Sequence, residues 1–245
     1  MSANTHSLRR SRLRACAVIT LRIAALVSCV VLSSVAPIPF QSNPTTLLAQ
    51  RNPIIRRADL PAGLGIARVT PASGSVLHFY RPPRIGESPG DYPPSDTVKF
   101  SPGKPSVEIG EAPPWLVPDQ LKMDYEIFYL RVVTLTRDWV EVIGNSSTGE
   151  TTWVSREAVS YTSWPEFLLE VHSVEAFDPE ASPVRARPLD SSPILSTARA
   201  ALAPLAIQGE WMKVDTNELA DRIQPEGWIR WRRGDRLLVT YNPLS

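Results

Sequence analysis

Cysteine and histidine are scarce in this sequence, and their positions limit its chemistry. Of 245 residues, two are cysteine (Cys16 and Cys29) and three are histidine. Both cysteines lie in an N-terminal segment with the features of an export signal, so a chain processed beyond Cys29 has neither disulfides nor thiol nucleophiles. Only His78 and His172 would then remain, whereas a zinc site needs three or four ligands at suitable spacing. We therefore predict no metal site and no cofactor.

Acidic residues are absent from the first 58 positions, which contain eight arginines. Five of these arginines precede an apolar run at 23–36, whose length is typical of a secretory signal and short for a membrane span. We predict a signal peptide and cleavage region at 1–49, cut after Ala49, with Ala36 as the alternative. Leu26–Cys29 also fits a lipobox, so lipidation at Cys29, a retained anchor and an organellar transit peptide stay open as alternatives.

The charge left after export excludes one class of partner. Cutting after Ala49 removes five of the 26 basic residues and none of the 25 acidic ones, which leaves a net charge of −4. Such a chain lacks the positive field that favours a phosphate backbone. We expect a protein of the periplasm, cell envelope or extracellular space that does not bind nucleic acid. It would meet the membrane only through an uncleaved or lipidated N-terminus.

Long helical periodicity is missing after residue 36. The sequence contains 24 prolines and 12 glycines, and its apolar residues occur in short alternating runs between turn-forming clusters. This pattern predicts an all-β fold.

A short pattern that occurs twice dominates the rest of the chain. In the first copy, Asp138–Val142 (acidic-Trp-apolar-charged-Val) is followed by a turn and by Trp153. In the second copy, Glu210–Val214 has the same form and is followed by Trp228. The two-residue alternation favours paired strands, and its recurrence indicates a tandem repeat. We therefore predict a linker at 50–61, a first repeat at 62–162 and a second repeat at 163–245.

The first repeat is longer because it contains a proline-rich insertion at 87–120. There are 58 positions from Arg81 to Trp139, but only 24 from Arg187 to the matching Trp211. The insertion contains eight prolines, and proline lacks the amide donor that a sheet needs. We predict a surface loop without central strands, which is either a mobile insertion or a binding loop.

Four segments of the second repeat occur in an ordered series: Val184–Pro188, Asp190–Leu195, Gly209–Val214 and Glu226–Ile229. With them, residues 166–245 resemble a bacterial Src-homology-3-like domain. The first repeat is similar mainly over Asp138–Val154, and it departs from the family by its insertion and by Thr152, where the family has glycine. The resemblance implies two tandem small SH3-like β-barrels of about five strands each. It also implies a binding module of the cell envelope that recognises a peptide, peptidoglycan or a protein partner.

The candidate ligand-binding residues are aromatic. Trp139 and Trp211 each begin a strand beside an acidic residue and could stack on a peptide or a sugar, but we prefer the alternative that both cap the core. Trp153 and Trp228 are expected to be more deeply buried still. Trp231 lies in the most basic stretch of the mature chain, which either binds an anionic polymer or forms a solvated strand face, and we prefer the latter. The full set of candidates is Tyr80, Trp115, Trp139, Trp211 and Trp231.

No catalytic site is predicted. The sequence has no Gly-x-Ser-x-Gly elbow, and Asp119, Asp124 and Glu126 are interpreted as solvated acids rather than as a glycosidase pair. We expect an exported, non-catalytic binding module of the cell envelope. The alternatives are a structural or assembly module that uses the barrels as spacers and, less favoured, a wall hydrolase.

Overall fold

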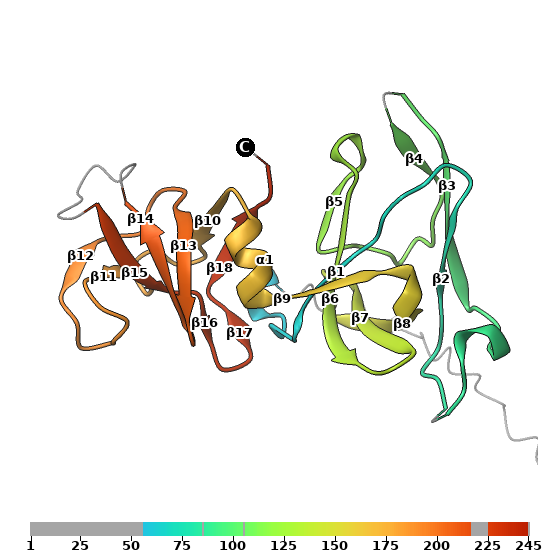
Figure 1. Ribbon diagram of the computed structural model, residues 1–245, viewed down its shortest axis with the longest axis horizontal. Coiled ribbons are helices and arrows are strands. Elements are labelled where there is room, and N and C mark those ends of the chain that lie inside the picture. Colours follow the sequence, from blue (N-terminus) through green and yellow to red (C-terminus); the bar gives the residue numbers. More distant parts are fainter. Residues whose placement is uncertain (1–55, 85, 105, 217–224, 245) are drawn as a thin grey trace, which may run out of the picture. The chain divides into compact units, whose positions relative to one another are not determined.

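The computed structural model describes residues 56–84, 86–104, 106–216 and 225–244. The predicted signal peptide, its cleavage sites and the lipidation site at Cys29 lie outside these residues. The described chain consists mostly of β-strands with a single α-helix, α1 (Trp164–Glu170) (Figure 1). The prediction of a β fold is therefore confirmed.

The strands before α1 form two sheets. One has the order β8-β7-β6-β1-β9, with β5 paired to β6, and the other has the order β2-β3-β4. The strands are β1 (Gly65–Arg68), β2 (Val76–Phe79), β3 (Asp96–Pro102), β4 (Val107–Glu111), β5 (Gln120–Lys122), β6 (Ile127–Leu135), β7 (Trp139–Asn145), β8 (Glu150–Ser155) and β9 (Ser160–Ser163). Short 3-10 helices are η1 (Arg57–Asp59), η2 (Pro89–Asp91), η3 (Met123–Tyr125) and η4 (Arg156–Ala158).

The helix α1 lies at the start of the second predicted repeat. Its N-terminus is fixed by a capping box, in which the Glu166 carboxylate accepts from the Ser163 hydroxyl at 2.8 Å and from the Ser163 backbone N–H at 3.2 Å. The helix buries Trp164, Phe167 and Leu168, so the predicted boundary between the repeats is a packed element.

The strands after α1 form one larger sheet and two strand pairs. The larger sheet has the order β12-β11-β15-β14-β13, and β10 pairs with β18 and β16 with β17. Their bounds are β10 (Ser173–Ala176), β11 (Val184–Arg185), β12 (Ile194–Ser196), β13 (Ala203–Gln208), β14 (Trp211–Asp215), β15 (Glu226–Arg230), β16 (Arg232–Arg233), β17 (Arg236–Leu237) and β18 (Val239–Asn242).

The repeated sequence pattern forms two hairpins that pair in the same register. Glu141 of β7 is opposite Trp153 of β8, and Lys213 of β14 is opposite Trp228 of β15. The strand before each hairpin has an irregularity at the same place, one extra residue in β6 at Val133 and in β13 at Leu205. We call the described residues before α1 the first half and those from α1 onwards the second half. Figure 1 shows the three antiparallel strands side by side in each half. The pairing of these three strands is thus the same in both halves.

The outer strands also follow the same order in both halves. In the first half, β1 lies between β6 and β9. In the second half, β10 pairs with β18 and is joined to the residue before β13 by a Val174–Leu202 bridge. Five strands in each half therefore pair in corresponding order.

The expected closed barrels are not observed, because no sheet of the described residues is closed. Among the described residues of the first half, the isolated Tyr80–Trp153 bridge is the one bridge from the β2–β3–β4 sheet to β8. In the described part of the second half, the Val174–Leu202 bridge is the one bridge from the β10–β18 pair to the larger sheet. The contacts that would close each barrel are single bridges rather than ladders.

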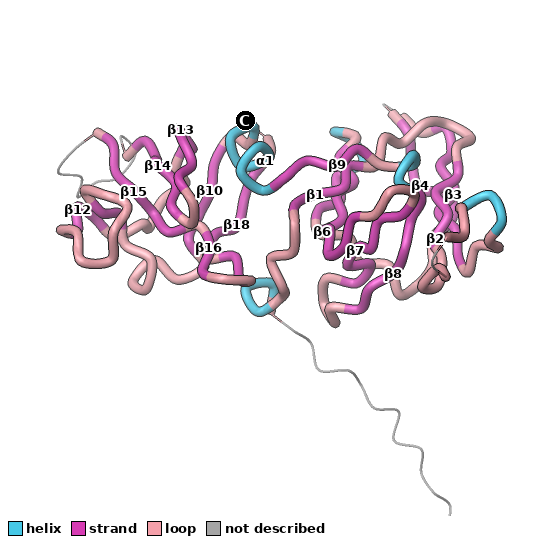
Figure 2. The backbone as a smooth tube through the Cα atoms, turned by 60° about the horizontal axis from the view of Figure 1, so that its bottom comes forward, coloured by secondary structure: helices cyan, strands magenta, loops and turns pink. Residues whose placement is uncertain are grey.

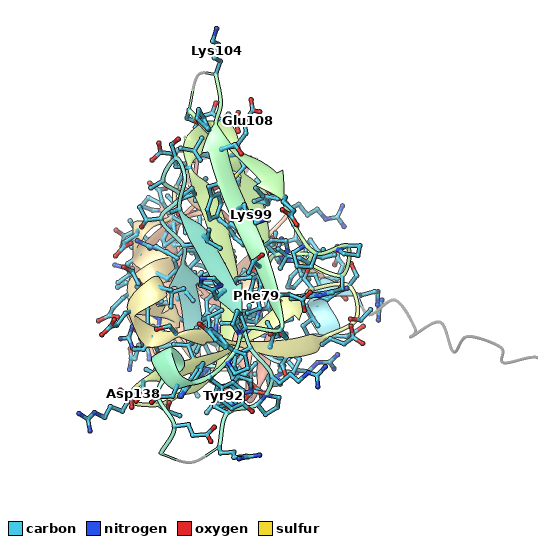
Figure 3. All side chains as sticks on the ribbon, turned by 90° about the vertical axis from the view of Figure 1, so that its right-hand side faces the viewer. Phe79, Tyr92, Lys99, Lys104, Glu108 and Asp138 are labelled. Atoms are coloured by element: carbon cyan, nitrogen blue, oxygen red, sulfur yellow. The ribbon has the colours of Figure 1, made fainter. Side chains whose placement is uncertain are left out.

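The prediction of a surface loop without central strands at 87–120 is wrong. Asp96–Pro102 forms β3, the middle strand of a sheet, with Val98 and Phe100 buried at 0% and 3% exposure. No proline lies between Pro94, which precedes this strand, and Pro102, which is its last residue, so the interior of the strand is free of proline. Figure 3 shows Lys99 on this strand and Lys104 at the tip of the hairpin between β3 and β4.

Two clusters of buried apolar residues form the core. One includes Phe79, Val98, Phe128, Leu130, Val142 and Val154 of the first half. The other joins Met212, Ile229, Trp231 and Val239 of the second half to α1 and to Ala62 and Ile66. Residues 56–61, within the predicted linker, contain η1 and the buried Leu60, which is 1% exposed. The segment just before the first strand is therefore packed against the protein.

Candidate functional site

The structure reverses the predicted order of tryptophan burial. Trp139 and Trp211 are 5% and 8% exposed, whereas Trp153 and Trp228 are only half-buried. The prediction that Trp153 and Trp228 are the more deeply buried pair is wrong. These two residues are paired with the charged Glu141 and Lys213, so their side chains share the outward face of each sheet.

Trp139 is covered by the proline-rich insertion. Its indole Nε1 donates to the backbone oxygen of Glu87 at 2.7 Å. The rings of Tyr80 and Tyr92 meet its ring edge to face, with centroid distances of 4.9 and 6.1 Å. Trp139 therefore packs against the Tyr80 ring and offers little surface to a ligand.

Trp231 belongs to the second core cluster, and Trp211 is buried outside that cluster. The Arg230 guanidinium lies 4.5 Å from the centre of the Trp211 ring and forms ion pairs with Glu210 and, at 2.7 Å, with Asp190. Trp231 is 1% exposed, and its Nε1 donates to the Gly209 oxygen at 3.0 Å. Neither ring lines a cavity of the first half.

Tyr80 and Trp115, which are 35 positions apart in the sequence, meet in one open cleft of about 450 Å³. The cleft lies where β2 ends and β8 begins, and Ser95, Asp96 and Trp115 of the insertion form one wall. Residues 81–82 and 150–152 complete the lining. The corresponding segments of the second half have no insertion to build such a wall.

Trp115 is held in place by three contacts. Its ring meets Phe79 edge to face at 5.2 Å, and its backbone oxygen accepts from Asn145 Nδ2 at 2.8 Å. The third contact is with Gly144, where a Cβ atom would lie 2.8 Å from the Trp115 ring. The absence of a side chain at Gly144 is therefore required for the indole to pack where it does.

The β8 edge beside this cleft has unpaired backbone groups. Trp153 exchanges two backbone hydrogen bonds with Tyr80, at 2.8 and 3.1 Å. Because backbone direction alternates along a strand, the N–H and C=O of Thr151 point to the same side, away from β7. From the Tyr80 bridge towards Thr151, no described strand pairs with this side of β8. Thr151 thus presents one donor and one acceptor to the cleft.

Two charges of opposite sign also line the cleft. Arg81 is exposed and Asp96 is half-exposed. Among the described residues, neither takes part in an ion pair. An aromatic wall, open backbone groups and both signs of charge suit a peptide-like ligand better than a purely apolar one.

A second group of interacting residues lies between the halves. The Asp119 carboxylate accepts from Arg131 Nη2 at 2.9 Å, from Arg57 Nη2 at 2.7 Å and from the Tyr241 hydroxyl. Arg131 also donates to the Pro61 oxygen at 2.9 Å and lies over the Trp164 ring at 5.7 Å. Asp119 and Arg131 are 6% and 1% exposed. Asp119 is therefore not the solvated acid that the sequence suggested.

The pKa values in this group follow from its geometry. Burial on its own raises the pKa of Asp119, but the charges of Arg131 and Arg57 and the hydrogen bonds of Tyr241 and Arg57 outweigh burial, so the pKa is lowered. Burial and the Asp119 charge together raise the pKa of Tyr241 well above its usual value. The group consequently holds an ionised Asp119 and a neutral Tyr241 at neutral pH, an arrangement suited to structure.

Comparisons with known proteins identify no family for this chain. No family model matches this sequence, and no curated protein is similar to it. Among the described residues, no set of three or more His, Cys, Asp or Glu side chains is placed to hold a metal ion. None of the helices in the same part of the chain is long and apolar enough to cross a membrane.

Sequence reasoning missed the wall of the cleft and the Asp119 group for different reasons. The alternation of Thr97, Val98, Lys99 and Phe100 predicts a strand, but the surrounding prolines obscured it. Asp119 and Tyr241 are 122 positions apart, and no local pattern connects them.

Proposed function

We propose that this protein is an exported, non-catalytic binding module of the cell envelope, built from two SH3-like repeats. In it, the cleft of the first repeat receives an extended peptide segment. The repeated Trp pattern and the matching strand order of the two halves support the repeat assignment. The N-terminal signal pattern supports export. The ligand could belong to peptidoglycan or to an envelope protein, and both offer a peptide chain.

The observation that carries the proposal is the open β8 edge within the cleft of Tyr80 and Trp115. An extended chain placed along Thr151 would pair with its N–H and C=O and thereby add a strand to the sheet. Main-chain hydrogen bonds would supply affinity without regard to sequence. Arg81, Asp96 and the two aromatic rings would contact alternate side chains or charged ends of the ligand and supply specificity.

Binding can be tested with the processed chain, isolated wall sacculi and soluble stem peptides released from them. We expect the chain to sediment with sacculi and the stem peptides to shift the amide NMR signals of Thr151 and its neighbours. Thr151→Pro removes the open donor at an edge position that tolerates proline. This change and Arg81→Ala should each weaken binding by about fivefold or more.

Arg84→Ala is the matched control, because Arg84 is exposed on the same connection and does not line the cleft. This variant should bind like the parent chain. If the parent binds neither sacculi nor stem peptides nor a defined envelope protein, the binding function is wrong. If binding occurs but is the same in Thr151→Pro and Arg81→Ala, the cleft is not its site.

A structural or assembly role is the second candidate, and the Asp119 group favours it. The buried Asp119 carboxylate has partners from both halves and so ties the two halves to each other, as a spacer would require. In that case, substitutions in the cleft would leave the role unchanged, whereas substitutions at Asp119 would abolish it. A hydrolase remains the least favoured alternative, since Asp119 is buried and its carboxylate is already bound to Arg57, Arg131 and Tyr241.

A further inference from the structure

A second cavity, of about 540 Å³, lies on the C-terminal half and belongs to no part of the proposed peptide cleft. Its apolar lining comes from Phe177, Leu237 and Leu238, and three arginines line it as well, Arg56, Arg233 and Arg236. Arg233 and Arg236 belong to the basic stretch around Trp231 noted in the sequence, which also contains Arg230 and Arg232. The cavity therefore combines an apolar surface with guanidinium groups.

The walls of this cavity are fixed by backbone contacts. Phe177 N–H donates to the Leu238 oxygen at 3.0 Å, which joins the segment after β10 to the segment after β17. Ala62 N–H donates to the Asp235 oxygen at 2.8 Å, and Pro61 forms a bridge with Arg236. Figure 2 shows η1 beside the β16–β17 hairpin as a result. A cavity held in this way is present before a ligand arrives.

The charges of the lining leave one guanidinium without a counter-ion. Asp59 accepts from Arg56 at 3.0 Å and also from Arg236, so one carboxylate serves two arginines. Asp178 Oδ1 accepts from the backbone N–H groups of Glu180 and Ala181, both at 3.1 Å. Arg233 is exposed and forms no ion pair with any residue that the structure describes. Three arginines and two aspartates leave a single positive charge in the lining.

We propose that this cavity binds a small amphiphile with one anionic head group, a carboxylate or a phosphate monoester, and a short acyl chain. The anionic head group would pair with the exposed Arg233, and its negative charge would neutralise the one unbalanced positive charge of the lining. The acyl chain would cover the half-buried Phe177 and Leu238 and remove them from water.

The proposal can be tested by titrating the processed chain with octanoate and with octyl phosphate, followed by amide NMR signals of Phe177, Leu237 and Leu238. Both ligands should shift these signals, whereas acetate and octyltrimethylammonium should not, because one lacks the chain and the other has the wrong charge. Arg233→Ala should weaken binding of both amphiphiles by about fivefold. Arg187→Ala, at an exposed arginine that does not line the cavity, should bind like the parent chain.

Three outcomes would overturn the proposal. Equal shifts with octyltrimethylammonium would show that only the chain is recognised. Unchanged binding in Arg233→Ala would remove the head-group contact. Sedimentation with anionic phosphatidylglycerol vesicles, without binding of soluble octyl phosphate, would indicate surface attraction rather than a cavity. Binding of octyl phosphate but not of vesicles supports a soluble ligand. Because the readout residues are distant in the sequence from Thr151, the result is independent of the peptide test.

Discussion

Asp119 has side-chain partners from both halves of the described chain. A buried carboxylate is costly unless charged and neutral donors replace its water. Here Arg131 comes from β6, Arg57 from η1 and Tyr241 from β18, so a single side chain connects three elements that are distant in sequence. Such a group can only form once both halves are folded.

Replacing Asp119 by asparagine should strongly destabilise the protein. The change leaves the buried Arg131 guanidinium without its counter-charge, and breaking a buried pair in this way costs about 3–5 kcal/mol. The measurement is the free energy of urea unfolding at pH 7. Asp124→Asn is the control, because Asp124 is exposed on η3 and should lose less than about 0.5 kcal/mol. Equal losses in both variants would contradict a special role for Asp119.

Asp119 should also make the stability of the protein depend on pH in the acidic range. The pKa of Asp119 is lowered in the folded state, whereas in the unfolded chain it is about 3.9. Its contribution to stability is therefore complete above the unfolded value and is lost as the pH falls through the lowered folded value. We expect the difference in unfolding free energy between the parent and Asp119→Asn to shrink below about pH 4. A difference that stays constant down to pH 2 would argue against the ion group.

Tyr241 acts at the opposite end of the pH range. Its pKa is raised in the folded state, so its contribution is complete below the unfolded value of about 10 and is lost as the pH rises through the folded value. Tyr241→Phe removes a hydrogen bond to a charged group and should cost about 1.5–3 kcal/mol at pH 7. Above pH 10, the parent should lose stability and approach the variant. Tyr125→Phe, at a tyrosine 60% exposed, should follow the parent throughout.

At the scale of the elements, the strand β3 explains why the first half differs from the second. Its alternating residues bury Val98 and Phe100, and the connections around it carry Asp96 and Trp115 to the cleft. The insertion therefore adds a sheet and a cleft wall rather than a loose loop. This is the reason to place a specific function in the first half.

Gly144 of β7 does not line the cleft itself, but it packs against the Trp115 wall. A Cβ atom there would lie 2.8 Å from the Trp115 ring and 3.0 Å from Thr152 Cγ2, so Gly144→Ala should displace the indole. We expect a loss of about 1–3 kcal/mol from overpacking and a changed tryptophan emission spectrum. Gly90→Ala, where nothing lies within 4 Å of the new Cβ, should change neither. An unchanged spectrum in Gly144→Ala would mean that Trp115 is not held by this contact.

Local patterns could predict the hairpins but not their surroundings. The alternation in Asp138–Val142 and Glu210–Val214 predicts the strands β7 and β14, because apolar and polar residues that alternate one by one are typical of a β-strand and not of a helix. It does not show which face is covered. Trp139 is buried because Glu87, Tyr80 and Tyr92 come from distant parts of the sequence, whereas Trp153 has no aromatic contact among the described residues and is half-buried.

At the scale of the whole described chain, the second core is completed by residues in and just before the first strand, β1. Ala62 and Ile66 are fully buried in the cluster that contains Met212, Ile229 and Val239. The Trp164 indole Nε1 donates to the Ala62 oxygen at 2.7 Å. The second repeat, although it carries the clearer family likeness, therefore shares its core with the start of the first repeat.

This shared core predicts that the second repeat is not independently stable. A fragment of residues 163–245 lacks Leu60, Ala62 and Ile66, and their loss leaves Trp164, Tyr241 and the helix α1 partly uncovered. We expect this fragment to lack a cooperative thermal transition, whereas residues 56–245 unfold in a single transition when followed by circular dichroism and by tryptophan fluorescence. Coincident transitions are the mark of one cooperative unit. A fragment 163–245 with dispersed amide NMR signals and its own sharp transition would show instead that the repeats are separate domains.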